Sequence, residues 1–357
     1  MDCLFFINTI LKRMNFLLFA AGVFIVGFVL VNVFISTLAP RGSRFFTQRL
    51  LHWVWKFFYA LANGNGNKSV MNYAGLFTLI IFLLAWVFLF WFGNTLIYAS
   101  QLDSVVSTAN NMPATPIQKF YFVGYILSTL GLGDFGPNGN GWMVYTSFIS
   151  FSGFIMISTI VSYLLSVSAG EIQKRKVSCF IHAMGSSPEN ILINAWNGKD
   201  FSRITNNFTE LTNLILEVSQ QHNAYPVLHN FHSNLINESF SVNLADLDEA
   251  LTILLLYKPE EMLPSKFEIY SLRYAITEFL ATLQKAHIHV SVKNPGPLKV
   301  EKLKKENIPL KDNSQKMDLN IEQLKFRRKL LLGMLENDGW DMQSIYAGKK
   351  LYQEYDF

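Results

Sequence analysis

Three long stretches without a charged side chain constrain this chain more than any other feature. They run from Met14 to Pro40, from Ser69 to Leu102 and from Phe135 to Gly170. A helix that crosses a lipid bilayer needs about 20 consecutive, mostly apolar residues. Each stretch exceeds that length, and the third begins with a turn-rich segment, so its helix is expected to start near Trp142. The sequence therefore predicts three membrane-spanning helices.

The charged residues divide the chain into two halves. Only 16% of the residues are charged, compared with about 25% in an ordinary soluble domain. Just 11 of the acidic and basic side chains lie before residue 171. We therefore predict an all-α membrane protein whose residues 171–357 form a mainly helical soluble domain. The net charge of +4 is small and spread along the chain, so it does not indicate nucleic-acid binding.

A glycine-rich hexapeptide lies between the second and third stretches. Residues 129–134 read Thr-Leu-Gly-Leu-Gly-Asp and follow the apolar segment 116–127, which is too short to span a bilayer. An ion-selectivity filter replaces the water around a cation with rings of backbone carbonyls. Aiming successive carbonyls in one direction requires backbone angles that glycine adopts most easily, which explains Gly131 and Gly133. We therefore expect a re-entrant pore helix followed by a filter, because non-helical backbone at membrane depth must line a watery path inside protein.

The hexapeptide resembles the signature of the potassium channels, and the resemblance extends from about Tyr121 to Leu165. It implies K+ as the permeant ion, bound by residues 129–132, and passive conduction without a cofactor or enzymatic chemistry. The filter residues that it implies are Thr129, Leu130, Gly131, Leu132 and Gly133, with Asp134 at the outer mouth.

The pore helix also carries residues that the resemblance assigns to filter support. Tyr121 and Phe122 stand where the family often has an aromatic pair, and Ser128 stands where it usually has a threonine. Tyr125 replaces a carboxylate seen in some members. Leu132 departs from the pattern, because most members have tyrosine or phenylalanine between the glycines. A potassium-selective channel is therefore expected, with a weakly selective cation channel or a non-conducting membrane sensor or scaffold as alternatives.

The assembly follows from the number of pore segments. One chain holds a single pore segment, whereas a cage of eight oxygens around an ion needs two stacked rings of four. We therefore expect a homotetramer closed by cyclic symmetry, with membrane lipids around it.

The third stretch contains two features that bear on gating. Gly153 lies twenty residues after Gly133, where many potassium channels keep a hinge, and its alternative role is close helix packing. Four apolar residues that recur at spacings of three and four could form a gate by dewetting, or could contact lipid. They are Phe154, Ile157, Val161 and Leu165.

Basic residues near the spans predict the orientation. The segment 41–68 has five basic residues and no acidic one, and three more follow at 174–176. Such regions usually face the cytoplasm. We therefore expect a multi-pass protein of the plasma membrane, with the N-terminus and the filter outside and residues 171–357 in the cytoplasm.

The length of the first apolar stretch and the periodicity of the apolar residues after it predict the organisation of residues 1–68. Residues 1–40 are expected to form an N-terminal transmembrane helix, although a secretory signal is an alternative. Residues 41–68 predict an amphipathic helix on the membrane surface, acting as a gating cuff or as a static anchor. The pore domain is expected over residues 69–170.

The second half has a regular apolar pattern but no motif for a ligand. Apolar residues at spacings of three and four between Phe201 and Val218 predict the core of a helical bundle, with a four-stranded coiled coil as the alternative. Residues 294–313 are expected to form an exposed linker. Two histidine pairs, His229 with His232 and His287 with His289, lack convergent carboxylates or cysteines and are interpreted as ordinary histidines. A regulatory ligand or partner for residues 171–357 is expected but not identified.

Overall fold

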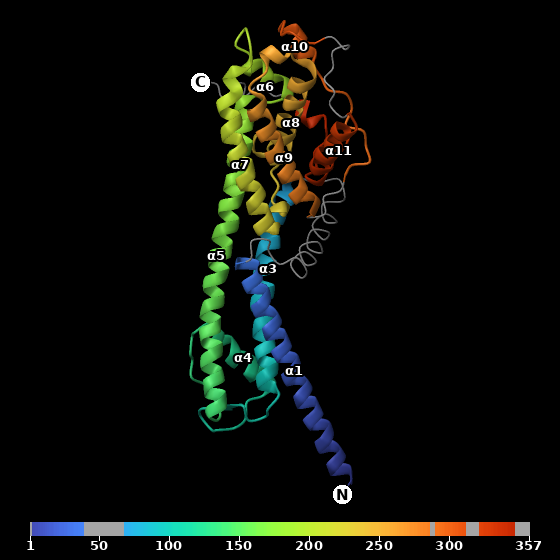
Figure 1. Cartoon of the computed structure of the whole chain (residues 1–357). Coiled ribbons are helices and arrows are strands. Elements are labelled where there is room, and N and C mark those ends of the chain that lie inside the picture. The colour runs from blue at the N-terminus through green and yellow to red at the C-terminus, as the bar shows by residue number, and fades with distance from the viewer. Residues whose placement is uncertain (1, 39–67, 286–289, 312–320, 347–357) are drawn as a thin grey trace. The chain divides into compact units, whose positions relative to one another are not determined.

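The computed structural model describes residues 2–38, 68–285, 290–311 and 321–346 (Figure 1). The predicted surface helix over residues 41–68 lies outside these residues except for Lys68, and so do His287 and His289. The described α-helices are α1 (Asp2–Leu38), α3 (Lys68–Ala99), α4 (Pro116–Leu127), α5 (Asn140–Met184), α6 (Pro188–Ala195), α7 (Thr205–Ala224), α8 (Phe240–Tyr257), α9 (Lys266–Lys285), α10 (Glu301–Lys305) and α11 (Ile321–Asn337). Two short strands, β1 (Val105–Ser107) and β2 (Phe135–Pro137), pair antiparallel.

Within the described ranges, three helices are long and apolar enough to cross a membrane, as the sequence predicted. The spanning candidates are Lys12–Thr37, Gly75–Ala99 and Asn140–Met184. The third helix begins two residues earlier than expected and continues without a break past Glu171 to Met184. The protein is thus an all-α membrane protein, and the predicted start of its soluble half falls inside a continuous helix.

The described residues form two compact units. The first unit contains α1, residues 79–99 of α3, α4 and α5 up to Ser166, and the second contains residues 68–78 and the chain from Val167 onward. Both α3 and α5 therefore contribute one end to each unit.

Aromatic and glycine contacts hold the helices of the first unit together. The rings of Phe82 and Trp86 on α3 lie 4.2 Å apart, and that of Tyr163 on α5 packs against both. Close approach between α1 and α3 requires Gly22, because a Cβ atom there would lie 2.7 Å from the carbonyl oxygen of Gly93. Small residues at such crossings allow helix backbones to pack closely within a membrane.

The second unit is a helical bundle built around α8. Every residue of α8 from Phe240 to Leu255 is buried. The periodic residues between Phe201 and Val218 also belong to the core of this unit, and α7 packs along α9. The prediction of a bundle core is confirmed for this chain.

The prediction of an exposed linker over residues 294–313 holds only in part for the described residues 294–311. Many side chains there are exposed, as those of Lys299 and Lys304 are, but the segment is anchored on the bundle. The segment contains α10, whose Leu303 is fully buried, and Ile308 is buried as well. The backbone N–H of Lys302 donates a hydrogen bond of 2.7 Å to the carboxylate of Glu189 on α6. The abundant lysines suggested a solvated segment, but two apolar side chains are enough to fix it on the bundle.

Candidate ion-conduction pathway

The pore helix α4 begins with a complete capping box. The side chain of Thr115 accepts a hydrogen bond from the N–H of Gln118, whose side chain accepts one from the N–H of Thr115 at 2.8 Å. Pro116 occupies the first helical position, where its missing N–H has no cost. These interactions fix the residue at which the helix starts. The helix ends at Leu127, directly before the hexapeptide.

The backbone of the hexapeptide alternates in conformation. Thr129, Gly131 and Gly133 have positive φ angles of 60°, 58° and 85°. Glycine adopts such angles freely, whereas a β-branched residue such as threonine does so at a cost. The N–H of Leu130 donates to the carbonyl of Tyr125 at 2.9 Å. The segment is therefore an irregular, repeating backbone that starts at the C-terminal end of a short helix.

Thr108, which sequence reasoning did not select, holds the outer end of the hexapeptide. Its hydroxyl lies 2.8 Å from the carbonyl oxygen of Gly133 and 3.0 Å from that of Asp134. Its N–H also donates to the Asp134 carbonyl at 3.0 Å. Because Thr108 directly follows β1, the pairing of β1 with β2 fixes this contact. No sequence signal predicts the contact between Thr108 and Gly133, since these residues lie 25 positions apart.

Two tyrosines of α4 support the segment after Gly133. Tyr121 donates a hydrogen bond of 3.1 Å to the Asp134 carboxylate, and Tyr125 donates one of 2.5 Å to the carbonyl of Phe135. Their rings are 5.3 Å apart in an edge contact. Phe122 is buried, with its ring 5.4 Å from that of Tyr125. These residues lie where the resemblance implied filter support.

Ser128 and Leu132 differ in their surroundings. The Ser128 hydroxyl donates to the carbonyl of Tyr125 at 3.2 Å and so closes the end of α4. The side chains of Leu130 and Leu132 are exposed on the single chain.

Lys119 has a structural role that sequence analysis missed. Its ammonium group is buried and donates to the carbonyls of Tyr98, Gln101 and Leu102 at 3.1, 2.6 and 3.0 Å. These carbonyls belong to the last residues of α3 and the turn after it. A cation is favourable at the C-terminal end of a helix, where the helix dipole is negative. The signal in the sequence was a lone basic residue in an apolar segment.

Gly153 allows α5 to touch the end of the pore helix. A Cβ atom at this position would lie 2.4 Å from the carbonyl oxygen of Leu127 and 3.0 Å from its Cα. The helix α5 runs through this position without interruption. The geometry favours the close-packing interpretation over the hinge, which stays a prediction.

The four apolar residues proposed for a gate lie on one exposed face of α5. Phe154, Ile157, Val161 and Leu165 are each at least half exposed on the single chain. Three hydroxyls run beside them at spacings of four, those of Ser158, Ser162 and Ser166, and each donates to the carbonyl four residues earlier. Hydroxyls that are satisfied in this way can face either lipid or water.

In the second unit, one turn contacts α3 near its N-terminal end and α5 in its C-terminal half. The ammonium of Lys174 on α5 lies 2.6 Å from the carbonyl oxygen of Phe231. A Cβ atom on Gly75 of α3 would lie 2.7 Å from the Phe231 ring and 2.8 Å from the carbonyl oxygen of Asn230. We call residues 228–231 the coupling turn, because they touch the N-terminal end of α3 and the C-terminal half of α5.

Histidines surround the coupling turn without forming a metal site. His229 in the turn packs its ring 5.0 Å from that of His222. Burial, together with the nearby Lys174 charge, lowers the pKa of His229 to about 3, so the ring is neutral at physiological pH. His232 lies 2.9 Å from the Asp338 carboxylate. Within the described part of the chain, no group of three or more histidine, cysteine or acidic residues is arranged to hold a metal.

Comparison with known proteins places this geometry in a family. Residues 76–169 match the family model described as "Ion channel". The match covers the second span, the pore helix, the hexapeptide and most of the third span. The chain belongs to this ion channel family, and its pore domain is of the potassium channel type. No solved structure matches the chain.

The resemblance to a relative extends beyond the pore domain. The chain is 34% identical over 304 residues to a protein of Bacillus subtilis (strain 168) named "Uncharacterized membrane protein YdjJ". The alignment covers 85% of this chain and 88% of the relative. The relative therefore shares both the pore domain and most of the second unit with this chain.

Proposed function

We propose that the chain forms a potassium-selective channel that conducts K+ passively through a homotetrameric pore. The observation that carries this proposal is the alternation of positive φ angles at Thr129, Gly131 and Gly133 directly after the pore helix. Such alternation allows successive carbonyls to point toward one axis, where they replace the hydration shell of an ion. Four copies are needed to close each ring of oxygens, and a closed ring follows from cyclic symmetry.

The carbonyls of residues 129–132 would bind K+. The carbonyl of Gly133 accepts a hydrogen bond from Thr108, so the outer mouth begins there and is completed by Asp134 and Tyr121. The C-terminal end of α4 leads into the filter, and its partial negative charge favours a cation at the inner side.

The exposed face of α5 would line the path below the filter. A row of large apolar side chains beside a row of hydroxyls suits a cavity that holds water when open and excludes it when closed. We place the gate at Phe154, Ile157, Val161 and Leu165, and membrane lipids around the other faces of the helix. In the plasma membrane, the N-terminus and the filter would lie outside and the second unit in the cytoplasm.

The exposed Leu132 side chain supports a second candidate within the same class. Most potassium channels have an aromatic residue here, and in this chain the tyrosines of α4 donate their hydrogen bonds to Asp134 and Phe135. A channel with a less rigid filter would conduct Na+ as well as K+. A non-conducting sensor or scaffold is the remaining alternative.

Current measurements on the purified full chain in a planar bilayer test these candidates. With K+ on one side and Na+ on the other, a reversal potential close to that of K+ is expected. A reversal near zero with robust current would favour the weakly selective channel. The mass of the protein in mild detergent should equal four chains, and a monomer or dimer would contradict the proposed pore.

The coupling turn supports gating by the second unit. A rearrangement of the bundle that moves Phe231 would act on α5 through Lys174 and on α3 through Gly75. Because Lys174 is buried and bound to two carbonyls of the turn, removing its charge should weaken that connection.

Single-channel recordings of Lys174→Met test the coupling. The open probability should change while the current through an open channel stays the same, because the filter is untouched. Lys176→Met is the matched control, since Lys176 is exposed on the same helix. Equal open probabilities in the wild type and Lys174→Met would contradict a role of this turn in gating.

A further inference from the structure

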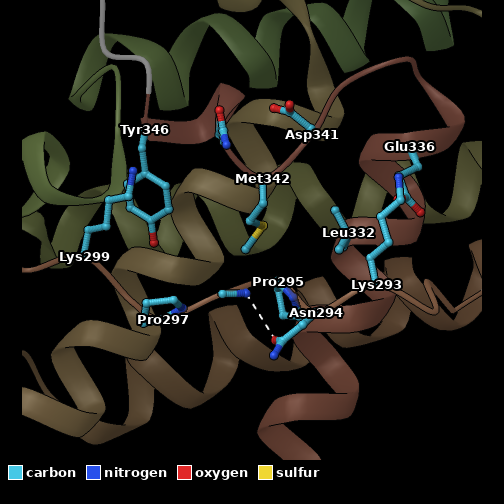
Figure 2. Close-up of a pocket in the computed structure, with 12 residues that line it drawn as sticks. Lys293, Asn294, Pro295, Pro297, Lys299, Leu332, Glu336, Asp341, Met342 and Tyr346 are labelled. Carbon is cyan, nitrogen blue, oxygen red and sulfur yellow. Dashed lines mark hydrogen bonds and ion pairs between the residues drawn. The ribbon is translucent and has the colours of Figure 1, made fainter. Parts of the chain in front are cut away.

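A cleft in the second unit has the size of a small-molecule site. Its volume is about 730 Å³, within the range of about 300–1,000 Å³ that is usual for ligand pockets. Three segments form its walls: residues 293–299, the C-terminal half of α11, and residues 341–346 (Figure 2). It belongs to neither the filter nor the coupling turn.

A buried ionic network holds two of these walls in place. The guanidinium of Arg328 binds the Glu249 carboxylate at 2.5 and 2.9 Å and also donates to the carbonyl of Gly296 at 2.7 Å. The same carboxylate accepts a hydrogen bond of 3.0 Å from the hydroxyl of Tyr346. Glu249 is fully buried and Arg328 nearly so. The cleft is therefore preformed, since both walls are fixed to one buried carboxylate.

The charges around the cleft differ between its two ends (Figure 2). At one end, the ammonium of Lys293 pairs with Glu336 at 2.8 Å, so its charge is neutralised. At the other end, the ammonium of Lys299 lies 4.6 Å from the centre of the Tyr346 ring. Among the described residues, no carboxylate lies within ion-pair distance of Lys299. The ammonium group of Lys299 thus lies beside an aromatic surface and, among the described residues, away from carboxylates.

The remaining lining suits an apolar body. Leu332 and Met342 project toward the centre of the cleft, and Pro295 and Pro297 lie on the opposite side (Figure 2). Asp341 and Glu336 stand away from Lys299, so that a ligand with several negative charges would meet carboxylates. The binding of one negative charge at one end is therefore favoured over a polyphosphate.

We propose that this cleft binds a small organic monoanion. Its carboxylate would pair with the Lys299 ammonium, and its planar or apolar body would pack between Tyr346, Met342 and Leu332. The site lies in the part of the chain where the sequence contains no ligand-binding motif.

Calorimetric titration of the full chain in lipid nanodiscs tests the proposal. The probes are benzoate and indole-3-acetate, each compared with its uncharged amide, and adenosine triphosphate as the polyanion. We expect at least one carboxylate to bind about tenfold or more tightly than its amide, because a charge-assisted hydrogen bond is lost with the charge. The polyanion should bind no more tightly than the carboxylates.

Two lysine variants locate the charge that matters. Lys299→Met keeps the apolar stem and should weaken the binding of the carboxylate about tenfold. Lys293→Met removes a lysine of the same segment whose charge is already paired, and its effect should stay within about twofold. Both variants should unfold at the temperature of the wild type.

Three results would overturn the proposal. They are equal binding of a carboxylate and its amide, unchanged binding in Lys299→Met, and no binding of any probe at millimolar concentration. The measurement requires no current, so its failure would leave the channel proposal unaffected, and a silent channel would leave this site unaffected.

Discussion

The two units satisfy their buried polar groups in different ways. In the first unit, the buried side chains of Lys119 and Tyr125 bind backbone carbonyls. In the second unit, carboxylates on α8 pair with arginines, as Asp248 does with Arg327 at 2.6 Å. Ionised side chains are costly within a membrane, whereas a soluble bundle can bury them if they are paired. The first unit should therefore be most sensitive to changes of backbone conformation, and the second to changes of charge.

Adding a methyl group to the glycines of the proposed filter should have the largest effect. Gly131→Ala and Gly133→Ala each place a side chain at a positive φ angle, which costs about 1–2 kcal/mol and disturbs the carbonyl direction. We expect K+ flux into liposomes to be abolished while the assembly keeps its size. Gly27→Ala on α1 is the control, because nothing lies within 4 Å of a Cβ atom there. Flux equal to the wild type in both filter variants would exclude conduction through this segment.

Breaking the Asp248 network should have the next largest effect. Asp248 is fully buried and bound by Arg327 at 2.6 to 3.0 Å. Arg327→Met leaves a buried carboxylate with a weaker partner, Arg273, so we expect a loss of about 3–5 kcal/mol in unfolding free energy. The unfolding of the full chain in detergent measures it.

A surface ion pair provides the matched control for that network. Arg175 lies 3.5 Å from Glu238, and its side chain is 58% exposed. Arg175→Met should cost no more than about 1 kcal/mol. If the two arginine variants were equally stable, the expected sensitivity of the second unit to changes of buried charge would be contradicted.

A small substitution at the contact between α4 and α5 should have a moderate effect. In Gly153→Ala the new Cβ atom would meet the Leu127 carbonyl, and overpacking of this kind costs about 1–3 kcal/mol. We expect a lower unfolding temperature of the full chain and, if the contact moves the filter, a reduced flux. An unchanged unfolding temperature together with altered opening would instead support the hinge.

The smallest expected effect concerns a buried acid two residues from Asp248. Neither carboxylate oxygen of Asp246 has a hydrogen-bond partner among the residues that the structure describes. Burial raises the pKa of Asp246 well above its ordinary value, and the charge of Glu249 adds to the shift. The folded-state pKa therefore exceeds the unfolded one. The fold is not penalised below the unfolded value of about 3.9, and it loses stability as the pH rises from there to the folded-state pKa.

Asp246→Asn should remove this pH dependence. We expect the variant to be more stable than the wild type at neutral pH by about 1 kcal/mol or more, and equal to it at low pH.

Asp248 has the opposite pH dependence. Burial would raise its pKa, but Arg273 and Arg327 lower it overall, so its contribution is lost as the pH falls through that value. Unfolding temperatures measured from pH 8 down to below the unfolded value of about 3.9 separate the two, and a wild type without the Asp246 slope would contradict the assignment.

Several elements followed from the sequence because their signals are local. The three spans depend on length and the absence of charge, and the pore helix follows from the short apolar segment 116–127 before the hexapeptide. The apolar periodicity of α7 placed its buried face correctly. The expectation for residues 294–313 was incomplete, because composition does not reveal that single side chains such as Leu303 are buried against other parts of the fold.

The candidate pore was predicted only in part, for the same reason. The positions of Gly131 and Gly133 are local requirements of the backbone. The support by Thr108, the three carbonyls around Lys119 and the contact of Gly153 with Leu127 each join segments that lie 17 to 26 residues apart in the sequence. Spacing alone does not predict such pairs.

The sequence by itself determined that this protein enters a membrane and carries a glycine-rich segment after a short apolar helix, because bilayer thickness and backbone stereochemistry act on consecutive residues. Only the tertiary structure decided how the buried charges of α8 are paired, which turn holds α3 and α5, and where a cleft forms beside Tyr346. Those features depend on the approach of side chains from distant segments, and a protein interior fixes such contacts only after the helices have packed.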